Sequence, residues 1–300
     1  MPENEYLKNR ANDRTAPPAS LSRLLCADSP SFLMEAHDGL SATIAREAGF
    51  PALWASGLTI SSSLGYRDCN EASWTTVTEV VERIVDSSGL PVLVDGDSGF
   101  GSFNNARLLA CKLRQRGAQG LCLEDKLYPK MNSFMERPHP LAQAREFSGR
   151  LQAVKDTAPD LILVARTEAL IAGQGMDEAL TRANTYADAG ADAILVHSKR
   201  RDAAEIEDFM RQWHKRLPVV VVPTTYFTTP TSLYREMGVS VVIWANHSLR
   251  AAAAAMRRAC AEIKAEESVA SVEATIAPLA DLFDLMDYDE LAEAERRYLG

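Results

Sequence analysis

The stretch PVLVD at residues 91–95 is a short apolar run, rich in valine, that ends in a carboxylate. Comparable runs recur along the chain: SFLMEA at 31–36, ALWAS at 52–56, GLCLE at 120–124, LILVAR at 161–166, DAILVHS at 192–198, PVVVVP at 218–223 and SVVIWAN at 240–246. Their apolar residues are continuous rather than alternating, which is typical of strands buried on both faces of a parallel sheet. The sequence therefore predicts about eight such strands.

Longer amphipathic segments separate these strands. TVTEVVERIVDSS at 76–88 and DEALTRANTYADAG at 177–190 have the 3.6-residue period of helices. Several segments end at a glycine that lets the chain turn into the next strand: Gly49, Gly117, Gly190 and Gly238. This repeat favours a closed (β/α)8 barrel of the TIM type. The alternative is an open doubly wound sheet, which often has a glycine-rich phosphate loop, but neither GxGxxG nor GxxxxGKS/T follows SFLMEA.

The repeat divides the chain into three parts. We expect residues 1–20 to be a disordered lead-in and residues 21–265 to form the catalytic barrel. Residues 266–300 do not continue the repeat and are predicted to form short amphipathic helices, which would serve to pair the chain with another subunit.

Composition excludes several classes of function. The net charge is -9 and no strong Lys/Arg cluster occurs, so nucleic acid is not an expected partner. No apolar run reaches the roughly 20 residues that span a bilayer, and the N-terminus lacks the apolar core of a signal peptide. The five cysteines show no CxxC spacing, which is typical of a cytoplasmic protein with reduced thiols.

Acidic residues gather where the predicted strands end, which in such a barrel is the catalytic face. Asp95 and Asp97 are two residues apart and would point the same way on an extended strand. Glu124 ends the next strand, and Asp68 lies on a polar loop that can reach them. Clustered carboxylates need a cation, and oxygen ligands alone favour Mg2+, or Mn2+, over zinc. The alternative for Asp97 is that it caps the helix that begins near Phe103.

A long loop follows the fourth strand. It contains Lys130, Asn132 and Ser133, a cation and two neutral polar groups that can fold over an anion, and a Pro-His-Pro sequence from Pro138. Such a loop suits a lid that excludes water, although any single residue in it could belong to a passive surface loop.

The remaining candidates surround the predicted anion site. Arg166 has a planar fork that binds two oxygens of a carboxylate or phosphate, unless it is merely paired with Glu168 or Glu124. His197 could donate to a phosphoryl oxygen, although a histidine at a strand end is often structural. Further candidates are Trp54 as an apolar wall and the backbone amides of Ser56 and Gly57 as a carboxylate site.

These residues lie within strings that resemble the phosphoenolpyruvate mutase branch of the isocitrate lyase/phosphoenolpyruvate mutase superfamily. The strings are WASG from Trp54, GYRDCNEASW from Gly65, DGDSGFGSFNNAR from Asp95, EDKLYPKMNS from Glu124, ARTEALIAG from Ala165, HSK from His197, VPTTY from Val222 and VIWANHSLRA from Val242. The resemblance runs from about Ser31 to the C-terminus, and the EDKxxPKxNS string is specific to this branch.

The resemblance implies roles for these positions. Asp95 would bind Mg2+ directly, and Asp68, Asp97 and Glu124 would hold its waters. The residues implied to line the substrate pocket are Trp54, Ser56, Gly57, Arg166 and His197, with Lys130, Asn132 and Ser133 on the gating loop. The family also implies a dimer of dimers in which a C-terminal helix is exchanged between barrels.

The implied reaction interconverts phosphoenolpyruvate and phosphonopyruvate by a dissociative phosphoryl shift, the step that forms the C–P bond in phosphonate biosynthesis. The first rival is a phosphonopyruvate hydrolase, whose lid tends to have threonine at the position of Asn132. The second is a lyase of 2-hydroxy diacids, whose lid carries a cysteine in a KKCGH string that this chain lacks. A non-enzymatic binding barrel would need neither the clustered carboxylates nor the lid. The chain departs from the family pattern at Ala55, Gly96 and Met131, where Gly, Ala and Thr are usual.

Overall fold

A computed structural model describes residues 20–136 and 138–300. Eight parallel strands close into a barrel in the order of the sequence, as predicted. The strands are β1 (Ser31–Ala36), β2 (Leu53–Ala55), β3 (Val92–Asp95), β4 (Gly120–Glu124), β5 (Ile162–Thr167), β6 (Ala193–Val196), β7 (Val219–Val221) and β8 (Val241–Trp244). Pairing of β1 with β8, through Ser31 and Val241 among others, closes the barrel.

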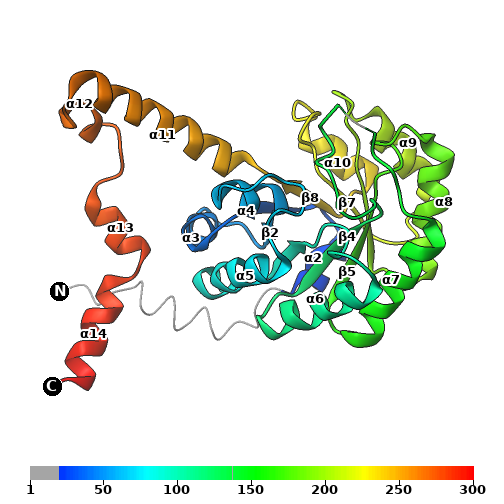
Figure 1. Cartoon of the computed structure of the whole chain (residues 1–300), viewed down its shortest axis with the longest axis horizontal. Helices are drawn as coiled ribbons and strands as arrows, with labels where there is room; N and C mark the ends of the chain where they lie inside the picture. Colours follow the sequence, from blue (N-terminus) through cyan, green and yellow to red (C-terminus); the bar gives the residue numbers. More distant parts are fainter. Residues whose placement is uncertain (1–19, 137) are drawn as a thin grey trace. The chain divides into compact units, whose positions relative to one another are not determined.

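Helices cover the outside of this barrel (Figure 1). They are α3 (Gly39–Glu47), α4 (Gly57–Ser63), α5 (Trp74–Ser88), α6 (Phe103–Gln115), α7 (Ala144–Thr157), α8 (Gly175–Asp188), α9 (Ala204–Trp213) and α10 (Thr231–Met237). The predicted glycine stops Gly49, Gly117, Gly190 and Gly238 all have positive φ, between 75° and 95°. Such a φ favours glycine because a side chain there is strained.

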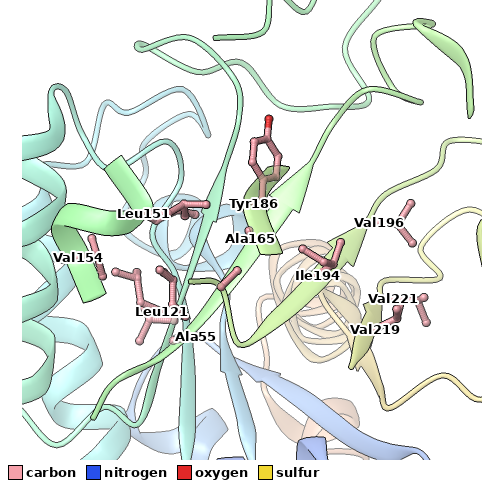
Figure 2. Packing of buried hydrophobic residues seen from close by; sticks show 14 of the residues in the cluster. Ala55, Leu121, Leu151, Val154, Ala165, Tyr186, Ile194, Val196, Val219 and Val221 are labelled. Atoms are coloured by element: carbon pink, nitrogen blue, oxygen red, sulfur yellow. The ribbon is translucent and has the colours of Figure 1, made fainter. Parts of the chain in front are cut away.

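Two apolar layers hold the barrel together. Alternate strand residues, such as Leu121, Ala165 and Ile194, point outward and pack with helix residues such as Leu151 of α7 (Figure 2). The residues between them point into the barrel and fill its interior. The short helix α2 (Leu21–Leu25) adds two leucines to this inner cluster. The interior is therefore a packed core, and only the last inward residue of each strand is free for chemistry.

The C-terminal part forms a second compact unit, whose described residues are Ser248–Gly300. It contains α11 (His247–Glu266) apart from His247, together with α12 (Ala270–Glu273), α13 (Leu279–Leu285) and α14 (Tyr288–Tyr298). The sequence-based boundary at residues 265 and 266 assigned α11 to the barrel. α11 buries none of its residues, and the compact barrel unit ends at His247, so the boundary after residue 265 stays a prediction.

Three further sequence-based predictions concern the N-terminal lead-in, the cysteines and membrane-spanning segments. The predicted lead-in, residues 1–20, lies outside the described residues except for Ser20. All five cysteines are free thiols, and Cys122 is the one that is buried. In the described part of the chain, no helix combines the length and the apolar character that crossing a bilayer requires.

Candidate active site at the carboxyl ends of the strands

The period of two along each strand positions the candidate residues. Leu93, Cys122, Val164 and Leu195 point into the barrel and belong to its inner core. The next inward positions, two residues later, are Asp95, Glu124, Arg166 and His197. Strand register brings the four together, since Asp95 lies opposite Cys122, and Glu124 opposite Arg166. The polar residues therefore form one layer directly above the apolar interior.

One small cavity opens above this layer. Of the candidates from the sequence, it is lined by Trp54, Ser56, Asp68, Asp95, Glu124, Lys130, Asn132, Ser133, Arg166 and His197. The two candidates outside the lining contact it indirectly: Gly57 donates its amide to Asp95 at 3.3 Å, and Asp97 pairs with Lys130. The structure thus brings the predicted residues to one place.

Asp95 and Asp97 converge for a reason different from the predicted one. β3 ends at Asp95, and Asp97 follows in a turn with φ of 50°, so the two are not on one extended strand. Both carboxylates still face Gly57, where a Cβ would lie 3.1 Å from Asp97 Oδ1 and 3.2 Å from Asp95 Oδ2. Asp97 does not cap the helix near Phe103 either, because the cap of α6 is Ser102. Because Asp97 lies in a turn and Ser102 caps α6, the Asp97 carboxylate remains available to the site.

The amides of Ser56 and Gly57 are engaged within the protein. The Ser56 amide donates to Ala36 at 3.4 Å, and the Gly57 amide donates to Asp95. The Ser56 hydroxyl accepts from Thr59 at the start of α4. In this arrangement the Gly57 amide supports Asp95, while the Ser56 amide is bonded to the end of β1.

The lid, whose described residues are 126–136 and 138–142, lies over the carboxylates. Lys130 is buried, with Nζ 2.5 Å from Asp68 Oδ1 and 2.9 Å from Asp97 Oδ1. Asn132 donates to the other oxygen of Asp68 at 2.6 Å. Burial alone would raise the pKa of Asp68, but Lys130 and Asn132 hold it below its usual value. The lid therefore supplies the positive charge that the acidic cluster requires.

Burial also changes how the other two acids titrate. It raises the pKa of Asp95 above its usual value despite the nearby charges of Lys130 and Arg166. It likewise raises the pKa of Asp97 to about 8. Both groups are therefore short of positive charge in this arrangement.

Arg166 and His197 form a separate cluster around Glu168. Glu168 is fully buried, and its Oε1 lies 2.5 Å from Nε of Arg166 and 2.8 Å from Nδ1 of His197. Arg166 Nε also lies 3.3 Å from Glu124. Burial would raise the pKa of Glu168, but Arg166 and His197 hold it well below its usual value. The ion-pair alternative for Arg166 is thus present in the structure, and it holds the guanidinium against the cavity.

A second buried lysine, at the start of the lid, connects this cluster to Ser133. Lys126 Nζ lies 2.6 Å from the Ser133 hydroxyl and 3.1 Å from Glu168 Oε2. The Ser133 hydroxyl donates to the same Glu168 oxygen at 2.7 Å. Ser133 therefore contacts Glu168 from the lid side, while Arg166 contacts it from the barrel side.

The ends of the lid are fastened to the barrel behind the cavity. The amide of Ala142 donates to the carbonyl of Asp125 at 2.8 Å, and Lys126 forms a bridge with Leu141. Arg182 of α8 donates to the carbonyl of Ala142 at 2.9 Å and to the carboxylate of Asp125 at 3.2 Å. The lid is therefore a long loop whose two ends are fixed side by side.

The donor set fits a hard divalent cation. Asp95 is half-buried and Asp97 is buried, both with raised pKa values, and Glu124 Oε1 is buried without a hydrogen-bond donor among the described residues. Such oxygens prefer Mg2+ or Mn2+. In the described part of the chain, no three acidic, His or Cys side chains are yet arranged as a ligand set. Lys130 places its ammonium group between Asp68 and Asp97 in this arrangement.

Sequence reasoning missed part of the site. The additional lining residues are Leu58, Phe134, Val222, Thr224, Ala245 and Asn246. It had also treated Glu168 merely as a partner of Arg166, although Glu168 organises a whole cluster. The signal for Glu168 was its place two residues after Arg166 at a strand end. Nothing in the sequence pattern separates Val222 or Thr224 from ordinary strand-end residues.

Comparison with known proteins adds to this geometry. The family model described as phosphoenolpyruvate phosphomutase matches residues 21–264. The chain belongs to this family. It is 49% identical over 282 residues to the phosphoenolpyruvate phosphomutase of Tetrahymena pyriformis, which covers 93% of this chain and 94% of that relative.

Solved structures of the phosphoenolpyruvate phosphomutase family and its relatives match the fold. The crystal structure of a phosphoenolpyruvate phosphomutase from Streptomyces platensis subsp. rosaceus has a TM-score of 0.91 at 39% identity, and covers 93% of this chain and 98% of that one. A phosphonopyruvate hydrolase in complex with oxalate and Mg2+ has a TM-score of 0.87 at 33% identity, with coverage of 93% and 98%. The mutase is thus the more similar of the two.

Proposed function

We propose that this enzyme interconverts phosphoenolpyruvate and phosphonopyruvate. The observation that carries the proposal is the arrangement of one cavity, lined by Asp95, Arg166 and His197 below and by Lys130 and Asn132 of the lid above. The similarity to named phosphoenolpyruvate phosphomutases at 49% and 39% identity supports it. The reaction breaks the bond between phosphorus and the enol oxygen and forms one between phosphorus and C3, so atoms balance without a co-reactant.

The chain's own residues would bind the two halves of the substrate in different ways. Arg166, held by Glu168, offers its planar fork to the carboxylate of the pyruvate part. Asn132 and His197 would hold the phosphoryl group while it moves from oxygen to carbon. Trp54, buried at the end of β2, closes the apolar side of the cavity. Fixed donors of this kind stabilise spread negative charge without reorganising.

Water exclusion decides which product forms. Water that reaches the phosphoryl group would hydrolyse it and give inorganic phosphate. Lys130 and Ser133 of the lid are nearly inaccessible to solvent, with exposed fractions of 6% and 5%. The closed lid therefore favours transfer to C3 over transfer to water.

A magnesium ion belongs to this proposal. Asp95 would bind it directly, with Asp68, Asp97 and Glu124 holding its waters, and Mn2+ would serve in its place. When bound, the ion would neutralise the carboxylates and the developing negative charge of the enolate. The hydrolase relative was solved with oxalate and Mg2+. Lys130 would have to withdraw from Asp97 to admit the ion, since its Nζ lies 2.9 Å from that carboxylate.

Phosphonopyruvate hydrolysis is the second candidate function, because the hydrolase relative shares the fold at 33% identity. Asn132 favours the mutase, since the hydrolase lid tends to have threonine there. The diacid lyases are disfavoured because residues 126–142 contain no cysteine.

Incubation with phosphonopyruvate and Mg2+, followed by 31P NMR, tests the proposal. The reaction is run in this direction because formation of phosphonopyruvate is uphill. Appearance of phosphoenolpyruvate is expected, and inorganic phosphate as the sole product would establish the hydrolase instead. An Asp95→Ala preparation serves as the matched control for contaminating activity. If neither product forms with wild-type enzyme, the proposed function is wrong.

We also propose that the chain works as a homo-oligomer, as a dimer of dimers with an exchanged C-terminal helix, in the cytoplasm. α11 spans 20 residues and buries none of them in a single chain. Apolar side chains stay exposed beyond it, among them Leu279, Leu282, Phe283 and Met286. Apolar surface of this kind is typical of subunit contacts, and five free thiols are compatible with a reducing compartment. Light scattering would measure the oligomeric state.

A further inference from the structure

Asn70 lies between the acidic cluster and the lid. Its side-chain amide nitrogen donates to Asp97 Oδ2 at 2.7 Å. Its side-chain oxygen accepts from the backbone amide of Lys130, also at 2.7 Å. A single short side chain thus joins a carboxylate at the end of β3 to the main chain of the lid.

The chemistry of this position suits asparagine. The side chain must donate in one direction and accept in the other, which excludes aspartate, since an ionised carboxylate only accepts. The backbone of Asn70 also has a φ of 61°, in the left-handed region that asparagine tolerates better than most residues. Such strained positions persist where surrounding contacts hold them, and here the two hydrogen bonds do so.

The hydrogen bond between Asn70 and the lid differs in kind from those that Asp68 makes with the lid. Asp68, on the same loop, holds the lid through the side chains of Lys130 and Asn132. These side chains are also needed by the substrate, so their bonds to Asp68 must change during turnover. Asn70 instead binds the main chain of Lys130, which leaves the Lys130 ammonium free to move while the lid stays down.

We propose that Asn70 is a positioning residue that latches the lid shut over the cavity, with Asp97 fixing the orientation of its amide. Its effect on which product forms rests on the proposed function, whereas its effect on lid closure does not. Loss of one partly buried hydrogen bond of about 1 kcal/mol makes an opening equilibrium about fivefold more favourable.

Asn70→Gly is the cleanest test, because glycine accepts a φ of 61° and removes only the side chain. Asn70→Asp keeps the shape and the acceptor but loses the donor and faces Asp97 with a like charge. Asn104→Asp is the matched control, since Asn104 is exposed on α6, away from the lid.

Limited trypsin digestion in Mg2+ and oxalate reports lid closure without any need for turnover. Lys126 and Lys130 are buried in the closed lid, so cleavage after them requires opening. We expect cleavage at these two sites to be about fivefold faster in both Asn70 variants than in wild type and Asn104→Asp. The melting temperature should stay within about 2 °C of wild type. Unchanged cleavage, or faster cleavage spread over the whole barrel, overturns the proposal.

The product ratio is the second readout. With phosphonopyruvate, the Asn70 variants should give a larger share of inorganic phosphate relative to phosphoenolpyruvate, because an opened lid admits water. If the product ratio is unchanged while lid cleavage is faster, the claim that lid closure by Asn70 determines the product is wrong. If wild-type enzyme forms no phosphoenolpyruvate, the proposed function is wrong. The digestion experiment still tests whether Asn70 holds the lid closed.

Discussion

Arg166 Nε lies 2.5 Å from Glu168 Oε1, and the two residues come from the same strand end two positions apart. The same Glu168 oxygen lies 2.8 Å from His197 Nδ1. One buried carboxylate therefore orients two of the groups that face the cavity. The roles of Arg166 and His197 depend on a residue that does not itself line the cavity.

Replacing Glu168 should therefore damage turnover through its neighbours. Glu168→Gln removes the charge that holds the Arg166 fork, and we expect kcat/KM to fall by about 100-fold. Steady-state kinetics with phosphonopyruvate measure this loss. Glu146→Gln is the control, because Glu146 also pairs with an arginine, Arg150, but its side chain is 57% exposed. Equal kinetics in wild type and Glu168→Gln would contradict the orienting role.

The pKa of His197 predicts a pH dependence of stability. Burial and the charge of Arg166 lower this pKa from its usual value of 6.5, so the folded protein favours the neutral ring. A lowered folded-state pKa contributes stability that is present above the unfolded pKa and is lost as the pH falls from there through the folded pKa. The free energy of unfolding should therefore decline between pH 7.5 and 5.5 more steeply in wild type than in His197→Gln. Urea titrations across that range measure both slopes, and parallel curves would rule out the effect.

Asn132 should matter for chemistry more than for folding. Its side chain is half-buried on the lid and contacts Asp68, with no part in the apolar core. We expect Asn132→Ala to lower kcat by about 100-fold while the melting temperature changes little. Asn132→Thr should instead increase the share of inorganic phosphate seen by 31P NMR. A large loss of thermal stability in either variant would count against the lid role.

The metal assignment predicts an effect of chelation. Thorough removal of divalent cations should abolish turnover, and added Mg2+ or Mn2+ should restore it in wild type. Asp95→Ala should stay inactive at any Mg2+ concentration. Its control is Asp160→Ala, an exposed carboxylate paired with Arg114. Full activity of Asp95→Ala with added Mg2+ would show that the metal assignment is wrong.

The Asp125–Arg182 pair should contribute mainly to stability. Asp125 is fully buried and accepts from Arg182, from Tyr186 at 2.7 Å and from the amide of Glu168 at 2.8 Å. Arg182→Leu leaves this carboxylate without its cation, and we expect the free energy of unfolding to fall by about 3 kcal/mol. Denaturant titration measures the change. The exposed Arg211→Leu, which also loses ion pairs with acids, should cost less than about 1 kcal/mol.

Particular residues show how much of the site can be predicted from the sequence. Asp95, Glu124, Arg166 and His197 could be placed at one end of a barrel because each follows an apolar run, and the side-chain period of a strand is two. The same argument gave the wrong reason for Asp97, whose turn breaks that period. The compact barrel unit ends at His247, and periodicity alone cannot mark that point, because an amphipathic helix such as α11 continues the same repeat.

By itself, the sequence determined the closed eight-stranded barrel and the composition of the polar layer above its core. Both follow from local periodicity, which repeats every few residues. Only the tertiary structure decided that Lys130 enters the gap between Asp68 and Asp97, that Asn70 joins the lid to Asp97, and that Arg182 fastens the lid's far end. These contacts join residues on loops and helices far apart in the chain. Loops have no repeating side-chain period, so contacts of this kind cannot be inferred from the sequence pattern.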